Sequence, residues 1–258
     1  MLENKVDLSG LQVLLTRPQH DGEQWRNQFQ SLGATVEHIP SFVIAPLAPP
    51  AQLQELLQQA SIGIFISGNA VRALDESLSD SSLKQSIDWY AVGPKTEALA
   101  TSLGFSVKPA AAHDSEGLLQ HESLKAVAGR SCVIIRGEGG RELLAETLRA
   151  RGADVNYCEL YRRDCAWQNE NRLASYLQQA KAECTVITVS SPDALNYTFL
   201  LAEKANMLGN IQSMPFLVAS DRVAIAAKQQ GVRCLIQART MQLADIVYGM
   251  NEWWIKQR

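Results

Sequence analysis

One α/β segment occurs twice in this chain of 258 residues. The stretch Leu14–Arg17 matches Val133–Arg136, and Gly33–His38 matches Gly152–Tyr157, so a strand, a turn, a helix and a second strand recur in the same order. Two further pairs continue the match downstream: Phe65–Val71 with Val189–Leu195, and Tyr90–Gly104 with Leu217–Gly231. The period is too long for a solenoid repeat. It predicts two similar lobes with a ligand-binding cleft between them.

The composition is that of an ordinary soluble globular protein, with 46% hydrophobic and 20% charged residues. No apolar run approaches the ~20 residues that cross a bilayer, and the start Met1–Lys5 lacks the basic and apolar regions of a signal peptide. The net charge of −3 argues against nucleic-acid binding, which requires a basic stripe. The sequence therefore predicts a cytoplasmic protein with no membrane or nucleic-acid partner.

The cysteine and histidine patterns do not indicate a metal or disulfide site. The five cysteines are scattered without a CxxC pair, which indicates packing thiols in a reducing compartment. The four histidines, His20, His38, His113 and His121, have no metal-ligand spacing. We therefore expect neither a metal nor a cofactor.

Short apolar strands alternate with amphipathic helices along the chain, which predicts parallel sheets covered by helices. The first strand is expected at Leu11–Thr16, and Pro40–Pro50, with its four prolines, is expected to be an extended connector. Ser115 is expected to cap a helix over 116–124, and a further helix is expected over Arg141–Arg151. The pair Trp253-Trp254 in the last helix is interpreted as packing.

Small polar residues follow several expected strands and begin the next helix. These strand tips are Ser67-Gly68-Asn69, Gly93-Pro94-Lys95-Thr96, Ser190-Ser191-Pro192-Asp193 and Ser220-Asp221-Arg222. The carboxyl ends of strands face the ligand crevice in open α/β sheets, and the free NH groups of a helix N-terminus suit carboxylates or phosphates. The same residue types are good helix N-caps, so capping alone is the alternative explanation for each tip.

Three charged or acidic side chains have two interpretations each. Arg17 and Arg136 occupy equivalent places in the two copies, where they either form local salt bridges or bind an anion bidentately. The glycine-rich segment after Arg136 lacks both GxGxxG spacing and a following GK[ST], which argues against a nucleotide site. No GxSxG elbow or evident Cys–His pair is present. Tyr161, at the end of the second copy's second strand, is a candidate proton donor, with core packing as the alternative.

Several of these segments together resemble the uroporphyrinogen-III synthase family over essentially the whole chain. The matching segments are Val13–Pro18, Phe65–Val71, Ala91–Leu99, Ser115–Leu119 and Cys158–Arg163. The resemblance implies two flavodoxin-like lobes of doubly wound parallel sheets joined by a two-stranded antiparallel connector. Lobe one would comprise residues 1–40 and 166–258, lobe two residues 48–158, and the connectors residues 41–47 and 159–165.

The resemblance also implies a substrate and a reaction. The substrate would be hydroxymethylbilane, a linear tetrapyrrole with an acetate and a propionate on every ring, and the product uroporphyrinogen III of haem and sirohaem biosynthesis. The enzyme would be a cofactor-independent, cyclising lyase that acts as a monomer in the cytoplasm, with transient contact to the preceding enzyme of the pathway. Tyr161 would assist departure of the hydroxyl as a general acid.

The residues expected to bind substrate lie mostly at the strand tips. They are Arg17, Ser67, Gly68, Asn69, Lys95, Thr96, Ser115, Arg136, Ser190, Ser191, Ser220 and Arg222. At the fourth tip, where many relatives have Gly-Pro-Thr-Thr, this chain has Ser220-Asp221-Arg222-Val223, so Arg222 would provide a charged donor instead. Two other classes of protein remain open on the residues alone. They are a non-catalytic, two-lobe binding protein for a small anionic ligand, and a transferase with a nucleotide-activated donor, which the missing phosphate loop disfavours.

Overall fold

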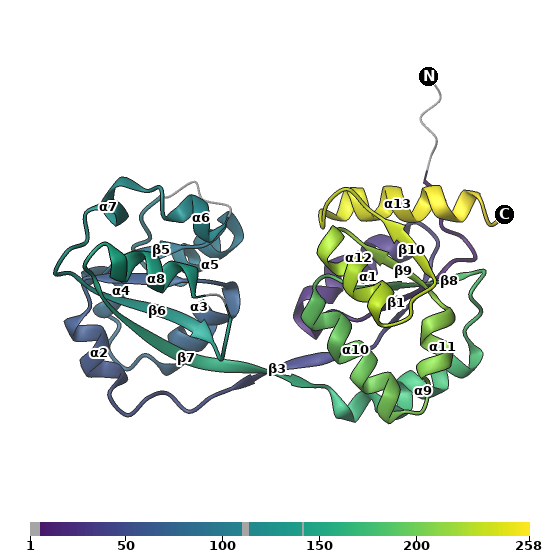
Figure 1. Cartoon of the computed structure of the whole chain (residues 1–258), viewed down its shortest axis with the longest axis horizontal. Coiled ribbons are helices and arrows are strands. Elements are labelled where there is room, and N and C mark those ends of the chain that lie inside the picture. Colours follow the sequence, from purple (N-terminus) through teal and green to yellow (C-terminus); the bar gives the residue numbers. More distant parts are fainter. Residues whose placement is uncertain (1–5, 110–113, 141) are drawn as a thin grey trace, which may run out of the picture. The chain divides into compact units, whose positions relative to one another are not determined.

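The computed structural model describes residues 6–109, 114–140 and 142–258, and within these leaves out the side chains of His20 and Asp21. The expectations that concern Met1–Lys5, the side chain of His20, His113 and a helix start at Arg141 lie outside the described residues. The chain forms two compact units, Met1–Val43 with Asp164–Arg258, and Ile44–Arg163 (Figure 1). Both boundaries fall inside the segments expected as connectors, 41–47 and 159–165.

Unit 1 (Met1–Val43 and Asp164–Arg258) is built on a five-stranded sheet in the order β10-β9-β8-β1-β2. Its strands are β1 Gln12–Leu15, β2 Thr35–His38, β8 Thr185–Thr188, β9 Pro215–Val218 and β10 Cys234–Gln237. Its helices are α1 Gln19–Ser31, α9 Glu170–Gln179, α10 Pro192–Lys204, α11 Leu208–Ser213, α12 Asp221–Gln229 and α13 Leu243–Ile255, with a 3₁₀ turn at Trp167–Asn169. All strand pairs are parallel.

Unit 2 (Ile44–Arg163) is built on a sheet in the order β3-β7-β6-β4-β5. The strands of this sheet are β3 Phe42–Pro46, β4 Ile62–Phe65, β5 Asp88–Ala91, β6 Ser131–Gly137 and β7 Asp154–Cys165. The start of β3 and the end of β7 belong to unit 1. The helices of unit 2 are α2 Leu53–Gln59, α3 Gly68–Ser77, α4 Leu83–Ser86, α5 Pro94–Ser102, α6 Ser115–Leu118, α7 Glu122–Lys125 and α8 Leu143–Ala150. The pairs among β4, β5, β6 and β7 are parallel, so the predicted α/β class with parallel sheets is confirmed.

The sequence repeat is preserved in the register of the strands. Leu15 of β1 pairs with Thr188 of β8, and their counterparts Ile134 of β6 and Ile64 of β4 pair in the same way. The pairing of β1 with β2 likewise matches that of β6 with β7, and the pairing of β8 with β9 matches that of β4 with β5. Each sheet therefore combines the first two strands of one copy with the last two of the other.

Both sheets have the strand order of a doubly wound sheet. In unit 1 the first strand, β1, lies between the second, β2, and the third, β8; in unit 2 the first parallel strand, β4, lies between β5 and β6. The connections therefore reverse direction between β1 and β8 and between β4 and β6. The carboxyl ends of strands at such switch points are where ligands bind in open α/β sheets.

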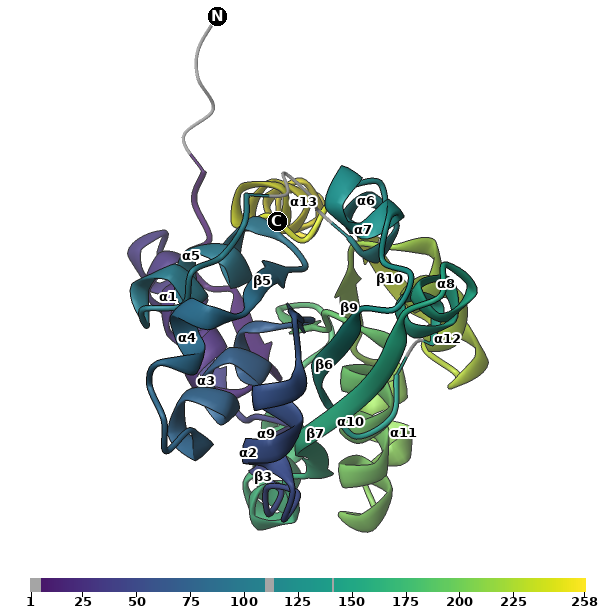
Figure 2. The ribbon, with the colours of Figure 1, turned by 90° about the vertical axis from the view of Figure 1, so that its left-hand side faces the viewer.

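Alternate residues of each strand face two helix layers. In unit 2, Val133 and Ile135 of β6 pack in a cluster with α2, α3 and α5, while Cys132 and Ile134 pack with α6, α7 and α8. Figure 2 shows α2 and α3 on one side of β6 and α8 on the other. In unit 1, residues of α1 and α13 share one cluster, which includes the buried Trp254.

Three local features differ from the sequence expectation or refine it. The second-copy strand is longer than expected, because β7 continues without a break to Cys165. The proline-rich segment contributes the edge strand β3, which suits prolines because an edge strand leaves some NH positions unpaired. The expected helix over 116–124 is two short helices, α6 and α7, and the cap of α6 is Asp114, whose carboxylate accepts from Gly117 N at 2.7 Å, and not Ser115.

Within the described residues, no helix is long and apolar enough to cross a membrane, and no group of three or more His, Cys, Asp or Glu side chains could hold a metal ion. The cysteines Cys132, Cys158, Cys165, Cys184 and Cys234 are all free thiols. Burial raises the pKa of Cys132 and of Cys158 to about 12, so neither is a thiolate nucleophile near neutral pH.

Candidate functional site

The structure places most of the predicted site residues at the carboxyl ends of the parallel strands. In unit 2, Arg136, Ser67 and the pair Lys95-Thr96 lie at or just after the ends of β6, β4 and β5. Tyr161 lies within β7, where it pairs with Gly137 at the end of β6. In unit 1, Arg17 follows β1, Ser190-Ser191 follows β8, and Ser220 with Arg222 follows β9. Each unit thus carries a row of polar groups along one edge of its sheet.

Three serines at these tips act as helix N-caps. The Oγ atoms of Ser67, Ser191 and Ser220 accept hydrogen bonds from the backbone N atoms three residues later, at 3.2, 3.1 and 3.4 Å. Capping is therefore part of what each serine does, as the alternative interpretation held. The cap uses one acceptor lone pair of each hydroxyl, so the hydroxyl proton and the second lone pair can still form hydrogen bonds with another partner. The NH groups of the first helical turn also remain open to an anion.

The structure shows core packing of Tyr161, one of its two interpretations, and places its hydroxyl against a strand tip. The residue is 2% exposed, and its ring belongs to the core cluster that faces α2, α3 and α5. Its hydroxyl lies 2.9 Å from Ser67 Oγ, the cap of α3, with either atom able to donate. The tyrosine hydroxyl is therefore fixed at the tip of β4 by a hydrogen bond, with its ring held by packing.

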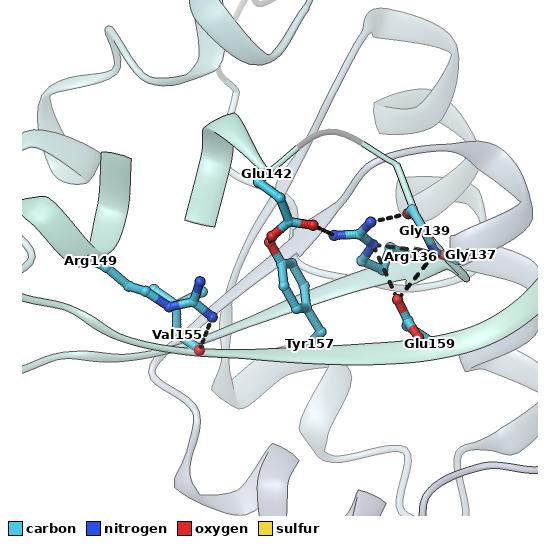
Figure 3. A network of polar contacts seen from close by, with 8 residues as sticks. All are labelled: Arg136, Gly137, Gly139, Glu142, Arg149, Val155, Tyr157 and Glu159. Carbon is cyan, nitrogen blue, oxygen red and sulfur yellow. Dashed lines mark hydrogen bonds and ion pairs between the residues drawn. The ribbon is translucent and has the colours of Figure 1, made fainter. Parts of the chain in front are cut away.

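Arg136 lies in a network of polar contacts at the end of β6 (Figure 3). Its side chain is 3% exposed, and its guanidinium donates to Glu142 Oε1 at 3.1 Å, to the carbonyl of Gly137 at 3.2 Å and to the carbonyl of Gly139. Glu159 lies 3.6 Å from its Nε. The guanidinium of Arg136 is therefore bound by the glycine-rich segment that follows it in the chain. Of the two interpretations of Arg136, the structure shows the local salt bridge.

Tyr157 extends this network on the face of β7 opposite Tyr161. Its ring lies 4.3 Å from the Arg136 guanidinium and 5.4 Å from that of Arg149, and its hydroxyl donates to Glu142 Oε2. Burial, reinforced by the hydrogen bond to Glu142, raises the pKa of Tyr157. The bond from Tyr157, followed by that from Arg136, lowers the pKa of Glu142. The tyrosine stays protonated and the carboxylate stays charged, which keeps the network intact at neutral pH.

The equivalent corner of unit 1 is organised around Arg17 and His38. The Arg17 guanidinium lies over the Trp25 ring at 4.4 Å, and the Arg17 carbonyl is 2.9 Å from His38 Nε2. His38 is 7% exposed, and burial lowers its pKa below the usual 6.5. The imidazole is therefore neutral at pH 7, and Nε2 carries the proton that it donates to the carbonyl. This bond fixes the backbone at the tip of β1.

We expect the buried His38 to make folding stability depend on pH just below 6.5. In this pH range His38 is more fully protonated in the unfolded chain, where its pKa is the usual 6.5, than in the folded chain, where burial lowers its pKa. The free energy of unfolding therefore rises as the pH increases toward 6.5. Urea unfolding at a series of pH values measures this slope. The variant His38→Gln is expected to flatten it, and an unchanged slope in that variant would assign the pH dependence to other groups.

The other expected site residues differ in their burial and in their position relative to the strands. The side chains of Lys95 and Arg222 are exposed, whereas Thr96 is buried at the start of α5. Ser115 begins α6, which contacts α8, and follows none of the named strands directly. Gly68 and Asn69 are half-buried in the first turn of α3, beside the Ser67 cap.

Sequence reasoning missed several groups that shape these tips. Thr16 donates to the carbonyl of Thr188 at 2.8 Å, which ties β1 to β8 across the switch point of unit 1. Ser41 contacts the carbonyls of Thr16 and Ala194, both at 3.3 Å. Gly137, at the end of β6, lies against the ring of Tyr161. No spacing rule identifies such residues, since each acts across strands that are distant in the sequence.

The fold and the tips define an α/β protein of two doubly wound parallel sheets with hydroxyl groups and helix N-termini along their carboxyl edges. The family model described as "Uroporphyrinogen-III synthase HemD" matches residues 23–247. The chain belongs to the uroporphyrinogen-III synthase family. It is 32% identical over 231 residues to uroporphyrinogen-III synthase of Escherichia coli K12, covering 86% of this chain and 92% of that protein. It is 26% identical to that of Synechococcus elongatus, covering 95% and 96%.

Solved structures of uroporphyrinogen-III synthases from two bacteria share the fold. The structure of uroporphyrinogen-III synthetase from Helicobacter pylori covers 96% of this chain and 100% of its own, with a TM-score of 0.66 and 16% identity. A mutant uroporphyrinogen III synthase from Thermus thermophilus covers 95% and 99%, with a TM-score of 0.60 and 17% identity. At these identities the likeness supports the fold, while the family assignment rests on the sequence matches.

Proposed function

We propose that this chain catalyses the dehydrative cyclisation of hydroxymethylbilane to uroporphyrinogen III, with inversion of the last ring. Its membership of the uroporphyrinogen-III synthase family is the observation that carries this proposal. In the reaction the terminal hydroxyl leaves as water, and the substituted carbon of the last ring attacks to give a spiro intermediate that rearranges to the closed macrocycle. The atoms balance without an external oxidant or reductant.

The strand tips suit a substrate of this kind. Hydroxymethylbilane carries two carboxylates on each of its rings, and the tips offer helix N-terminal NH groups beside Ser67, Ser191 and Ser220. Further donors at the same edges are Lys95, Thr96, Ser190 and Arg222. We propose that these groups bind the carboxylates and so hold the bilane in the conformation that closes with inversion. Orientation of an intramolecular reaction can contribute up to ~7 to 11 kcal/mol.

Tyr161 is proposed as the general acid for departure of the hydroxyl. Its hydroxyl lies at the tip of β4, 2.9 Å from Ser67 Oγ, and so among the proposed substrate donors. A hydrogen-bonded neighbour can hold the phenol in the orientation from which it donates its proton to the leaving oxygen. Core packing of the ring is compatible with this role, because rigid support is what fixes a catalytic group.

We further propose that each unit is a flavodoxin-like lobe and that β3 with β7 forms the antiparallel connector. The strand orders of the two sheets support the first point. Two hydrogen bonds support the second, because Ala166 N bonds to Ser41 O at 3.0 Å whereas Leu47 N bonds to Leu160 O at 2.9 Å. The residue numbers therefore increase along one strand while those of the hydrogen-bonded partners decrease along the other, which is typical of antiparallel pairing.

The proposed reaction is tested by the isomer that the purified chain produces. We expect freshly generated hydroxymethylbilane to give the type III isomer after oxidation, whereas the bilane left without protein closes spontaneously to isomer I. Chromatographic separation of the two isomers gives the answer directly. Product that consists only of isomer I would overturn the proposal. Tight binding of the bilane together with that result would favour the alternative of a non-catalytic binding protein.

A further inference from the structure

The ring of Tyr161 crosses the end of the neighbouring strand to reach Ser67. Tyr161 lies on β7 and Ser67 follows β4, and β6 lies between these two strands in the sheet. The 2.9 Å contact between their hydroxyls therefore spans the end of β6. The residue of β6 at that point is Gly137, the last of the strand. Only a residue without a side chain leaves this path open.

The contact between Gly137 and the ring is close. A Cβ atom added at Gly137 would lie 2.5 Å from Cε2, 2.7 Å from Cζ and 3.0 Å from Cδ2 of Tyr161. Carbon atoms in van der Waals contact lie ~3.5 to 4.0 Å apart, so an alanine at this position would force the ring to move. Cζ carries the hydroxyl, and any shift of the ring carries the hydroxyl with it.

A β-bulge brings Tyr161 to the same face of the sheet as Gly137. Arg136 pairs with Glu159, but Gly137 pairs with Tyr161, so the register shifts by one residue at this point. Without the shift, strict alternation would place Tyr161 on the face of Tyr157, which packs against the α6, α7 and α8 cluster. Instead Tyr161 joins the opposite cluster. Bulges commonly re-aim a side chain next to a functional site.

We propose that Gly137 is a positioning residue for the reaction: its missing side chain, together with the bulge beside it, sets the Tyr161 hydroxyl against Ser67. This inference rests on the proposed role of Tyr161 as the general acid. Gly137 is required for the space it leaves and not for its backbone conformation, since it is not among the glycines with positive φ. Ser67 cannot follow a displaced ring, because its Oγ is held by Ala70 N in the cap of α3.

The variant Gly137→Ala tests this directly. We expect kcat for type III product to fall by about 100-fold, the loss that a misplacement of about 1 Å can cause, with KM changed by no more than a few-fold. The double variant Gly137→Ala/Tyr161→Phe is expected to be no slower than Tyr161→Phe alone, because both changes remove the same positioned hydroxyl. Additive losses in the double variant would overturn the inference, as would a kcat for Gly137→Ala equal to that of the wild type.

A second readout does not depend on turnover. In protein with ¹³C-labelled tyrosine rings, the Tyr161 signals, assigned with Tyr161→Phe, are expected to shift in Gly137→Ala. Unshifted signals in that variant would overturn the inference whatever the wild type produces. By contrast, a wild type that gives only isomer I while the signals shift would overturn the proposed function and leave the positioning of the ring standing. The two failures are therefore distinguishable.

Two other glycines provide matched controls. Gly209 in α11 has no atom within 4 Å of an added Cβ, so Gly209→Ala is expected to leave both kcat and the ring signals unchanged. A Cβ atom added at Gly63 in β4 would lie 2.3 Å from the Trp89 ring, so Gly63→Ala strains the same core without touching Tyr161. If Gly63→Ala reproduced the kcat loss in folded protein, general strain and not ring placement would account for Gly137→Ala, and the inference would fail.

Discussion

Replacing Tyr161 with phenylalanine is expected to lower turnover for type III product by ~100-fold or more, the usual contribution of a positioned general acid. The change removes the hydroxyl that contacts Ser67 at 2.9 Å and keeps the ring that packs in the core. The free energy of unfolding should fall by only about 1 kcal/mol, since one hydrogen bond is lost and no cavity is created. A large kinetic loss with a small loss of stability would separate chemistry from folding.

Single-turnover measurements of isomer III formation, corrected for spontaneous closure to isomer I, measure the effect on the chemical step. Tyr157→Phe is the matched control, because Tyr157 also lies on β7 and also loses a hydroxyl contact, to Glu142, but on the other face of the sheet. We expect its rate to stay within a few-fold of the wild type. If the rate of Tyr161→Phe did so as well, Tyr161 would be a packing residue, and proton donation would have to come from another tip.

The internal repeat made most of the fold predictable. Matching strands such as Leu14–Arg17 and Val133–Arg136 occupy corresponding positions in the two sheets, with the same register to their neighbours. What the repeat could not predict is that the copies exchange halves, so that β1 pairs with β8 and not with β4. That choice depends on pairing between residues far apart in the chain. The resemblance to the family is the sole basis on which the sequence predicts this exchange of halves.

The candidate site was predictable where local rules apply and not where strands meet. Ser67, Ser191 and Ser220 follow from a simple pattern, a strand ending in a small polar residue that opens a helix. By contrast, the bulge at Gly137 involves a one-residue shift between two strands, which alternation in the sequence does not reveal. Serine is a good N-cap, so the sequence predicts Ser115 as the cap of α6, but aspartate is as good a cap, and the chain uses Asp114 one residue earlier.

Other expectations from the sequence stay predictions. They are the monomeric state, the cytoplasmic location and a transient contact with the preceding enzyme. The individual substrate contacts of Arg17, Lys95 and Arg222 also stay predictions, because a pattern of donors fits many arrangements of eight carboxylates on four rings. The isomer assay addresses the reaction, and variants at each tip would address the contacts.

The variant Arg136→Met is expected to lower the free energy of unfolding by about 2 to 3 kcal/mol, and so to show that the arginine holds its own loop together. Its side chain is 3% exposed, so its loss removes buried charge-assisted bonds to Glu142 and to the carbonyls of Gly137 and Gly139. Breaking a fully buried pair costs ~3 to 5 kcal/mol. We expect a smaller loss than this for Arg136→Met because the side chains of Glu142 and Glu159 are 49% and 39% exposed, so their carboxylates regain water when the arginine is removed.

Urea unfolding measures this loss, with Arg149→Met as the matched control. Arg149 stacks on the same Tyr157 ring but is exposed, so its replacement should cost less than about 1 kcal/mol. The comparison measures how much the local contacts of Arg136 stabilise the free protein, because a side chain committed to its loop contributes to stability before any substrate binds. If Arg136→Met kept the stability of the wild type while raising KM for the bilane, the contacts in the free protein would be weak ones that give way to a substrate carboxylate. A loss of stability with KM unchanged would instead assign Arg136 to the support of the loop, beside the bulge that aims Tyr161.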